Sequence, residues 1–185
     1  MRLKKIIKQL EGKFPLELAE EWDNVGLLLD STRREIKSIM LCLDITRDIV
    51  DNAVANKVDL IISHHPFIFS PLKKITTDEV NGEKILKLAR NNIAVYSMHT
   101  NIDSGIGGLN DFIIKKIGQE GKVFAISDNR SIELRKLVTS DLIDAKDKII
   151  NPLRIQKLKN AITIEELCKI IKEKLCIPNV RVVGD

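Results

Sequence analysis

Side chains that can bind a metal ion follow two short apolar runs of the sequence. His64 and His65 come directly after the run 58–63, and His99 and Asp103 come at and after the end of the run 93–98. The chain contains 3 histidines, so all of them lie at these two ends. An apolar, β-branched run of this length is typical of a buried strand, and ligands of open α/β sheets bind beyond the carboxyl ends of the strands. We therefore expect the four side chains to form one site.

Imidazole nitrogens and carboxylate oxygens are ligands of zinc, iron, manganese or nickel. Adjacent side chains on an ideal strand point to opposite faces, but where the chain turns at Pro66 the rings of His64 and His65 can converge or hold different ions. This geometry favours a two-metal site. The competing interpretation is that each histidine is an ordinary hydrogen-bonded residue and that Asp103 only forms a turn. It predicts that the three histidine side chains do not approach one another.

Two other segments have alternative interpretations. The glycine-rich stretch 105–108 is a weak phosphate-binding signal without the Walker lysine, and a flexible connector explains it equally well. The segment Trp22-Asp23-Asn24 is compatible with a pocket wall, and also with a packed tryptophan followed by a turn.

The order of the expected elements indicates an α/β fold. Helices are expected from apolar spacing and capping residues, and strands from continuous apolar runs. The expected helices cover residues 3–10, 47–56, 83–90, 109–117 and 163–175, and the expected strands 27–29, 38–44, 60–63, 93–98, 123–126, 132–138 and 179–183. Strand–helix–strand units predict a mainly parallel or mixed sheet with flanking helices, in which 38–44 is a central strand. We expect a metal-binding lobe at 1–120 and an incomplete second lobe at 121–185.

Composition bounds the class of protein. A hydrophobic share of 44% and a charged share of 30% are typical of a folded chain, and the 4% of aromatic residues argue against a single-strand nucleic-acid binder. The net charge of +4 comes with lysines spread along helices, which favours solvated faces over a nucleic-acid patch. The 3 cysteines form no CxxC pair, and no apolar run reaches membrane length or forms a signal peptide. A cytoplasmic location is therefore expected.

Three motifs in this order resemble the Nif-three-like family of dinuclear-metal proteins, whose members include YbgI and type 2 GTP cyclohydrolase I homologues. They are Trp22-Asp23-Asn24-Val25-Gly26-Leu27, His64-His65-Pro66 and His99-Thr100-Asn101-Ile102-Asp103. The resemblance covers most of residues 1–120 and resumes near 162–185.

The resemblance implies a two-lobed α/β fold, two divalent metal ions and a homohexamer. His64, His65 and Asp103 would be metal ligands, and His99 would be a further ligand or the nearby catalytic base. The family site is completed by a His and a Glu near the C-terminus, after the strand that here ends at Asp185. Because no histidine follows His99, we expect the chain to lack that segment.

Three functional hypotheses follow. The first is a metal-dependent hydrolase acting on a nucleotide, in a reaction like that of GTP cyclohydrolase, with a phosphoesterase as a close variant; a divalent ion lowers the pKa of bound water to about 7. The second is a metal-binding oligomeric scaffold or regulatory protein without turnover. The third is a small α/β domain with no metal site.

Overall fold

A computed structural model describes residues 1–32, 35–125 and 152–183 of the chain. It divides the chain into two compact units, Met1–Ile102 and Asp103–Asp185, which are treated separately below. The lobe boundary expected at residue 120 stays a prediction. The expected strand 132–138 lies outside the described residues.

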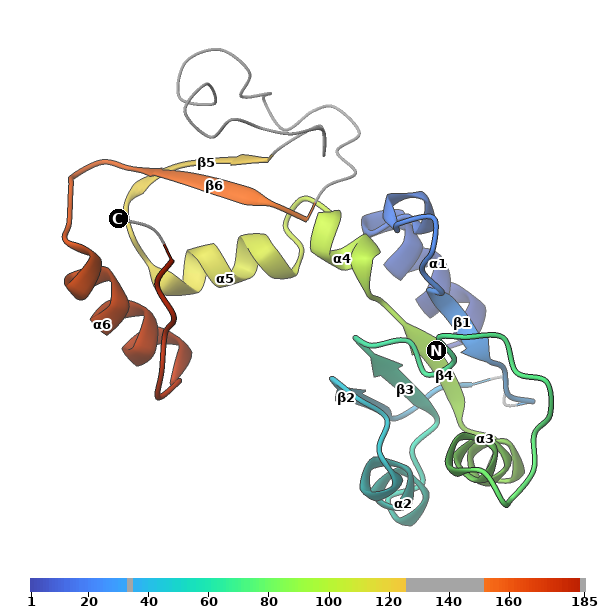
Figure 1. Cartoon of the computed structure of the whole chain (residues 1–185). Coiled ribbons are helices and arrows are strands. Elements are labelled where there is room, and N and C mark those ends of the chain that lie inside the picture. Colours follow the sequence, from blue (N-terminus) through green and yellow to red (C-terminus); the bar gives the residue numbers. More distant parts are fainter. Residues whose placement is uncertain (33–34, 126–151, 184–185) are drawn as a thin grey trace. The chain divides into compact units, whose positions relative to one another are not determined.

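The first unit is built on a four-stranded mixed sheet in the order β1-β4-β3-β2 (Figure 1). Strands β2, β3 and β4 run parallel, and β1 pairs with β4 antiparallel. The elements of this unit are α1 (Leu3–Lys13), a short 3₁₀ helix (Leu16–Leu18), β1 (Gly26–Leu29), β2 (Ile39–Cys42), α2 (Arg47–Ala55), β3 (Leu60–Ser63), α3 (Val80–Arg90) and β4 (Ala94–Ser97). The expected α/β fold with a mixed sheet is therefore confirmed.

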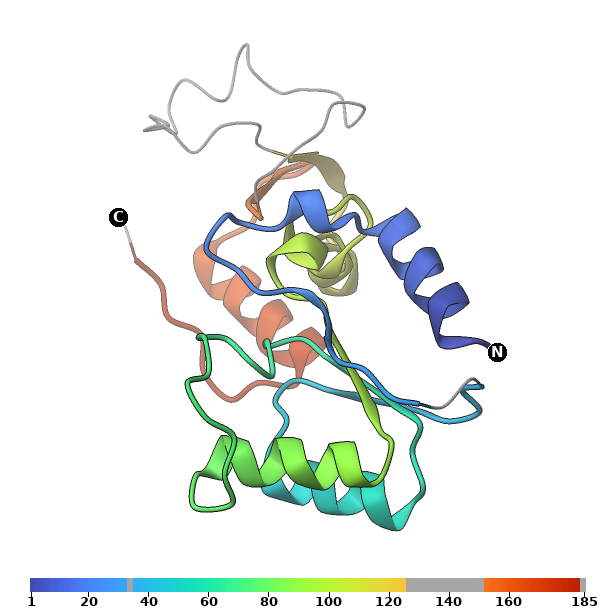
Figure 2. The ribbon, with the colours of Figure 1, turned by 90° about the vertical axis from the view of Figure 1, so that its right-hand side faces the viewer.

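Alternating side chains of β3 and β4 divide the core into two layers. Leu60 and Tyr96 pack with the apolar face of α1, while Ile61 and Val95 face the opposite side and pack with α2 and α3. Leu60, Ile61 and Val95 have no exposed surface. Figure 2 shows α2 and α3 side by side along one face of the sheet. The central strands are continuously apolar because both of their faces are covered.

The prediction that residues 38–44 form a central strand is wrong. Among the described residues, strand β2 lies at the edge of the sheet and pairs with β3 alone. The side chains of this segment are consequently open: Ile39 is 46% exposed, Leu41 74% and Leu43 58%. A continuous apolar run predicts a strand that is at least partly buried. It does not predict whether that strand lies at the centre or at the edge of the sheet.

Helix ends agree with the capping residues in the sequence. The side chain of Thr46 accepts a hydrogen bond from the backbone of Ile49 at the start of α2. In the second unit, Thr163 and Glu166 form a capping box at the start of α6 (Ile164–Leu175), and Gly118 ends α5 (Leu109–Ile117) in the left-handed conformation. These ends are local, so the sequence alone predicts them.

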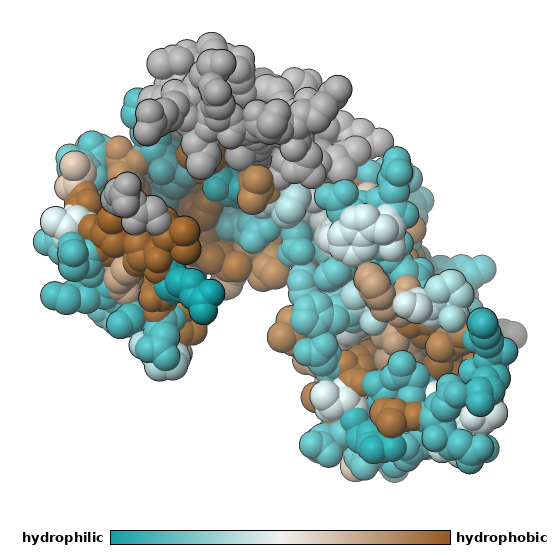
Figure 3. All heavy atoms as spheres, in the orientation of Figure 1, coloured by the Kyte–Doolittle hydropathy of each residue, from teal (hydrophilic) through white to brown (hydrophobic). Residues whose placement is uncertain are grey.

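The second unit combines helices α5 and α6, which contact each other, with an antiparallel pair of strands, β5 (Gly121–Ala125) and β6 (Arg154–Leu158). Residues 179–183 form no strand, contrary to expectation. Hydrophobic side chains remain on the surface of this unit, among them Phe112 at 60% and Leu153 at 53% exposure (Figure 3).

The state of the cysteines and the length and polarity of the helices were both considered from the sequence. Cys42, Cys168 and Cys176 are free thiols. In the described part of the chain, every helix is too short or too polar to cross a bilayer.

A candidate metal centre at the carboxyl ends of β3 and β4

The three histidines lie together at one edge of the sheet of the first unit. His64 and His65 follow β3, and His99 follows the neighbouring strand β4 after one residue. The ring centroid of His64 is 5.2 Å from that of His65 and 5.1 Å from that of His99, and the other pair is 5.7 Å apart. One ring nitrogen from each residue lies within 4.8 Å of those of the other two. The competing interpretation from the sequence, in which these side chains stay apart, is therefore wrong.

Hydrogen bonds beyond the strand ends hold the first two histidines in place. The backbone N–H groups of His64 and His65 donate to the carbonyls of Cys42 and Leu43, at 3.1 and 3.0 Å, so pairing with the β2 side continues past β3. The Ser63 hydroxyl donates to the carbonyl of His65 at 2.9 Å. This closes a turn immediately before Pro66, and the turn brings both rings to the same side.

The Nδ1 atoms of these two rings take part in hydrogen bonds within the chain. Nδ1 of His64 lies 3.0 Å from the carbonyl oxygen of Met98, and Nδ1 of His65 lies 2.7 Å from Oδ1 of Asp44. A carbonyl or an ionised carboxylate only accepts hydrogen bonds, so each Nδ1 carries the proton. The lone pair of each neutral ring is then on Nε2. Metal-binding histidines are commonly oriented in this way by an acceptor on the other ring nitrogen.

His99 is oriented by Asp23, which comes from the segment before β1. Nδ1 of His99 lies 3.0 and 3.1 Å from the two carboxylate oxygens of Asp23. The same carboxylate accepts hydrogen bonds from the backbone N–H of Asn24 at 2.8 Å, from the backbone N–H of Thr100 at 3.1 Å, and from the Thr100 hydroxyl. The side chain of Asp23 has no exposed surface. His99 therefore also presents Nε2 as its free nitrogen.

The pKa of Asp23 is below its ordinary value of 3.8. Burial of the carboxylate raises this pKa, but the hydrogen bonds from Thr100, His99 and Asn24 together outweigh the effect of burial. The carboxylate is thus ionised at neutral pH, and it can stabilise a positive charge on the imidazole of His99.

The donor set fits a divalent cation. Three neutral imidazoles that each offer one nitrogen are a known set of protein ligands for catalytic zinc, and imidazole also suits iron and nickel. The side chain of His65 is 46% exposed and that of His99 19%, so the cluster is open to solvent on one side. An ion bound here would keep a route for water or substrate.

Asp103, the fourth residue expected at this site, belongs to α4 (Thr100–Ser104) and is the first residue of the second compact unit. Its backbone carbonyl accepts a hydrogen bond from the side chain of Asn110 at 3.2 Å. Its role as a metal ligand stays a prediction from the motif.

Sequence reasoning missed the two carboxylates that orient the rings, Asp23 and Asp44. Asp44 ends the apolar run of β2, so it stands at the same edge of the sheet as His64 and His65, and this position was a usable signal. Asp23 lies in the segment Trp22-Asp23-Asn24, which the sequence marked as a possible pocket wall, but its partner His99 is 76 residues away and could not be predicted from that segment.

Comparisons with known proteins agree with these motifs. The family model described as Duf34/NIF3 (NGG1p interacting factor 3) matches residues 1–185. A protein of Clostridium acetobutylicum named GTP cyclohydrolase 1 type 2 homolog is 34% identical over 185 residues, which is 100% of this chain and 63% of that protein. A protein of the same name from Clostridium perfringens is 35% identical over 185 residues, 100% of this chain and 64% of its own length. The chain thus spans slightly less than two thirds of these relatives.

A solved structure gives the same result. The hypothetical protein SA1388 of Staphylococcus aureus superposes with a TM-score of 0.80 at 30% identity, over 100% of this chain and 68% of its own. The family resemblance inferred from the three motifs is confirmed, and the chain belongs to the Duf34/NIF3 family.

Proposed function

We propose that His64 and His65 bind divalent metal, with His99 beside them as a further ligand or as the catalytic base, and that the protein is a metal-dependent hydrolase acting on a nucleotide, in a reaction like that of GTP cyclohydrolase. One observation carries the proposal: each ring donates its Nδ1 proton to an oxygen of the chain, so that the lone pair of the neutral ring is on Nε2, and the ring centroids lie 5.1–5.7 Å apart. The names of the two clostridial relatives supply the nucleotide.

When bound, a divalent ion supplies Lewis acidity, which makes water a competent nucleophile near neutral pH. The chain supplies orientation and proton transfer. With Nδ1 held by Asp23, the Nε2 atom of His99 can accept a proton from the water that attacks C8 of the purine ring, and the carboxylate stabilises the imidazolium that results. His64 and His65 hold the ion.

The proposal includes a second metal ion, with Asp103 among the ligands, and a homohexameric assembly. These parts rest on the motif His99-Thr100-Asn101-Ile102-Asp103 and on the family, in which a His and a Glu from a later segment complete the site. The candidate ions are zinc, iron, manganese and nickel, and metal analysis of the protein distinguishes among them.

The test is metal analysis together with GTP turnover of the full-length protein. His65→Ala is expected to lose bound metal and turnover together. His99→Ala separates two roles: if His99 moves protons, the variant keeps its metal and loses turnover, whereas a ligand role predicts loss of both. Turnover that is unchanged in His65→Ala, or a protein that binds no divalent metal, would refute the proposal.

The alternative is a metal-binding oligomeric scaffold or regulatory protein. The open apolar edge formed by Ile39, Leu41 and Leu43 favours association with other chains or segments. This alternative predicts metal binding and a stable assembly without turnover of GTP or of phosphate esters. A phosphoesterase would instead hydrolyse such esters with the same dependence on His65.

A further inference from the structure

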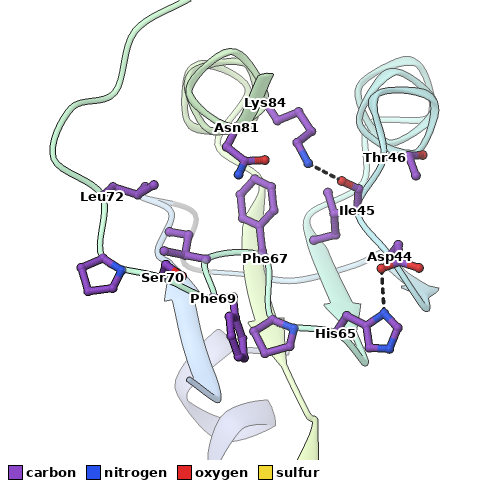
Figure 4. A pocket seen from close by; sticks show the side chains of 13 residues that line it. Asp44, Ile45, Thr46, His65, Phe67, Phe69, Ser70, Leu72, Asn81 and Lys84 are labelled. Atoms are coloured by element: carbon purple, nitrogen blue, oxygen red, sulfur yellow. Dashed lines mark hydrogen bonds and ion pairs between the residues drawn. The ribbon is translucent and has the colours of Figure 1, made fainter. Parts of the chain in front are cut away.

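A cavity of about 540 Å³ lies against His65, within the first compact unit. Its walls come from the loop 65–72, the start of α2 and the face of α3 that carries Asn81 and Lys84 (Figure 4). The volume is within the range of small-molecule sites, which is about 300–1,000 Å³. Because His65 and Asp44 are part of the wall, a ligand in this cavity would lie beside the imidazole cluster.

Lys84 places a positive charge in the cavity. Its Nζ donates a hydrogen bond to the carbonyl of Ile45 at 2.8 Å and lies 5.4 Å from the ring centroid of Phe67. An ammonium group has three protons, so two remain for a ligand. Among the described residues no carboxylate forms an ion pair with Lys84, whereas Lys87 on the same helix pairs with Asp51 at 2.6 Å. The charge of Lys84 is therefore available to an anion.

Burial of the Lys84 ammonium lowers its pKa, and the neighbouring Arg47 contributes in the same direction, while Asp44 opposes both. A partly desolvated cation interacts more strongly with an anionic partner than one in water. Asn81 lies on the same side of α3, three residues before Lys84, and its amide points toward the same space in Figure 4. It offers a second hydrogen-bond donor to an anionic group.

Two exposed aromatic side chains lie between the cavity and His99. Phe69 is a wall of the cavity and is 54% exposed, and Trp22 is 60% exposed. Their ring centroids are 6.0 Å apart with an angle of 60° between the planes, and the centroid of Trp22 is 6.2 Å from that of His99. Aromatic faces that are open to solvent bind planar heterocycles, such as nucleic-acid bases, by stacking.

We propose that this cavity binds a planar heteroaromatic ring that carries an anionic group, with the ring against Trp22 and Phe69 and the anion on Lys84 and Asn81. This inference rests on the proposed function, because it names the contacts of the substrate that the imidazoles would act on. It accounts for the Lys84 ammonium, which forms no ion pair with a carboxylate in the described part of the chain, and for two large aromatic side chains that are exposed to water beside the same imidazole cluster.

Trp22 makes the test direct, because it is the only tryptophan in the chain. Its fluorescence is followed while the protein is titrated with GTP, guanosine and inorganic triphosphate, with and without EDTA. GTP is expected to quench the emission and to saturate. Guanosine should quench at concentrations at least about tenfold higher, a difference of about 1.4 kcal/mol. Triphosphate should displace GTP without quenching.

Matched variants separate the two contacts. Lys84→Met keeps the aliphatic stem beside Phe67 and is expected to weaken GTP binding at least about tenfold while guanosine binding stays the same; Lys84→Arg should retain GTP. Lys87→Met, on the same helix but outside the cavity, should bind GTP as the wild type does. Phe69→Leu should weaken GTP and guanosine by the same factor.

The inference is wrong if Lys84→Met and Lys87→Met lose the same affinity, if GTP and guanosine bind equally well, or if none of the probes quenches Trp22. Failure of the metal centre gives a different pattern: in EDTA the quenching by GTP and its dependence on Lys84 persist although no turnover is found. Conversely, if GTP turnover requires His65 but is unchanged in Lys84→Met, the proposed metal centre is supported and the proposed role of the cavity in binding GTP is refuted.

Discussion

The replacement Asp23→Asn tests how the metal centre is held. Asparagine has the shape of aspartate, but one carboxylate oxygen becomes an NH₂ group that only donates. Oδ2 of Asp23 accepts from the N–H and hydroxyl of Thr100, and Oδ1 accepts from the N–H of Asn24. His99 lies within 3.1 Å of both oxygens. Whichever way the amide is turned, one group of donors faces another donor.

The expected effect on stability follows from this count. The amide oxygen is expected to keep the two hydrogen bonds from Thr100, and the NH₂ group then leaves the N–H of Asn24 without its acceptor. Hydrogen bonds to a charged group contribute about 1.5–3 kcal/mol each, so the free energy of unfolding should fall by about that amount. The side chain of Asp23 has no exposed surface, so water cannot replace the lost partner.

The effect on metal binding has a different origin. The NH₂ group then stands in the place of Oδ1, 3.0 Å from Nδ1 of His99, while the remaining oxygen is shared with the two donors of Thr100. Two N–H groups that face each other disfavour a proton on Nδ1, so the proton of the neutral ring shifts toward Nε2. The nitrogen that faces the other two histidines then has no lone pair to offer. Loss of a partner that orients a ligand histidine typically costs a factor of about 10–100 in metal affinity. With His99 as a ligand, we expect a loss of this size in competition titrations against a chelator; with His99 as the base, we expect unchanged metal affinity and a loss of turnover. A changed tautomer in ¹⁵N NMR of the imidazole is expected in both cases.

Asp59→Asn is the matched control. Asp59 is 4% exposed and accepts hydrogen bonds from the backbone N–H groups of Lys37 and Ser38, at 2.8 and 3.1 Å. It precedes β3, at the end of the sheet opposite the histidines. It should lose stability but keep the metal affinity of the wild type. If Asp23→Asn keeps the metal affinity, the turnover and the imidazole tautomer of the wild type, or if both variants lose affinity equally, the proposed role of Asp23 is wrong.

The pH dependence of stability is a second test of the same variant. Because the pKa of Asp23 is lower in the folded protein than its ordinary value of 3.8, its contribution to stability is complete above that value and is lost as the pH falls through the folded pKa. The difference in unfolding free energy between wild type and Asp23→Asn should therefore be constant near neutral pH and shrink in acid. Urea denaturation at a series of pH values measures it, and a difference that grows in acid would contradict the assignment.

Three further outcomes are expected from the packing. Leu41→Thr, at the open edge, should change the free energy of unfolding by less than about 0.5 kcal/mol, whereas Ile61→Ala in the core should cost about 2–5 kcal/mol in the same denaturant titration. Gly82→Ala should destabilise by about 1–3 kcal/mol, because an added Cβ would lie 2.1 Å from a backbone carbonyl oxygen of the preceding loop; a melting temperature equal to that of the wild type would contradict this. Cys42, whose pKa is raised by burial and then by the nearby Asp44, should be alkylated more slowly than the exposed Cys176, as mass spectrometry of the digested protein would show.

Local chemistry is what the sequence by itself determined. The hydroxyl of Thr46 and the capping box at Thr163 act within one helical turn, so the helix starts could be predicted without the fold. The apolar runs 60–63 and 93–98 indicated buried strands, and a parallel sheet brings the carboxyl ends of neighbouring strands together. For this reason the pattern of the chain was enough to predict that His64, His65 and His99 meet.

Only the tertiary structure decided the order of the strands and the partners of the rings. The apolar run of β2 does not distinguish an edge strand from a central one, because that depends on which segments pair beside it. Likewise, the position of Asp44 at the end of an apolar run indicates the sheet edge that it shares with His65, but the sequence around Asp23 and Asp44 does not indicate which imidazole each carboxylate would contact. Those contacts form because the sheet brings together segments 76 and 21 residues apart, and they determine which nitrogen of His99 and His65 is free.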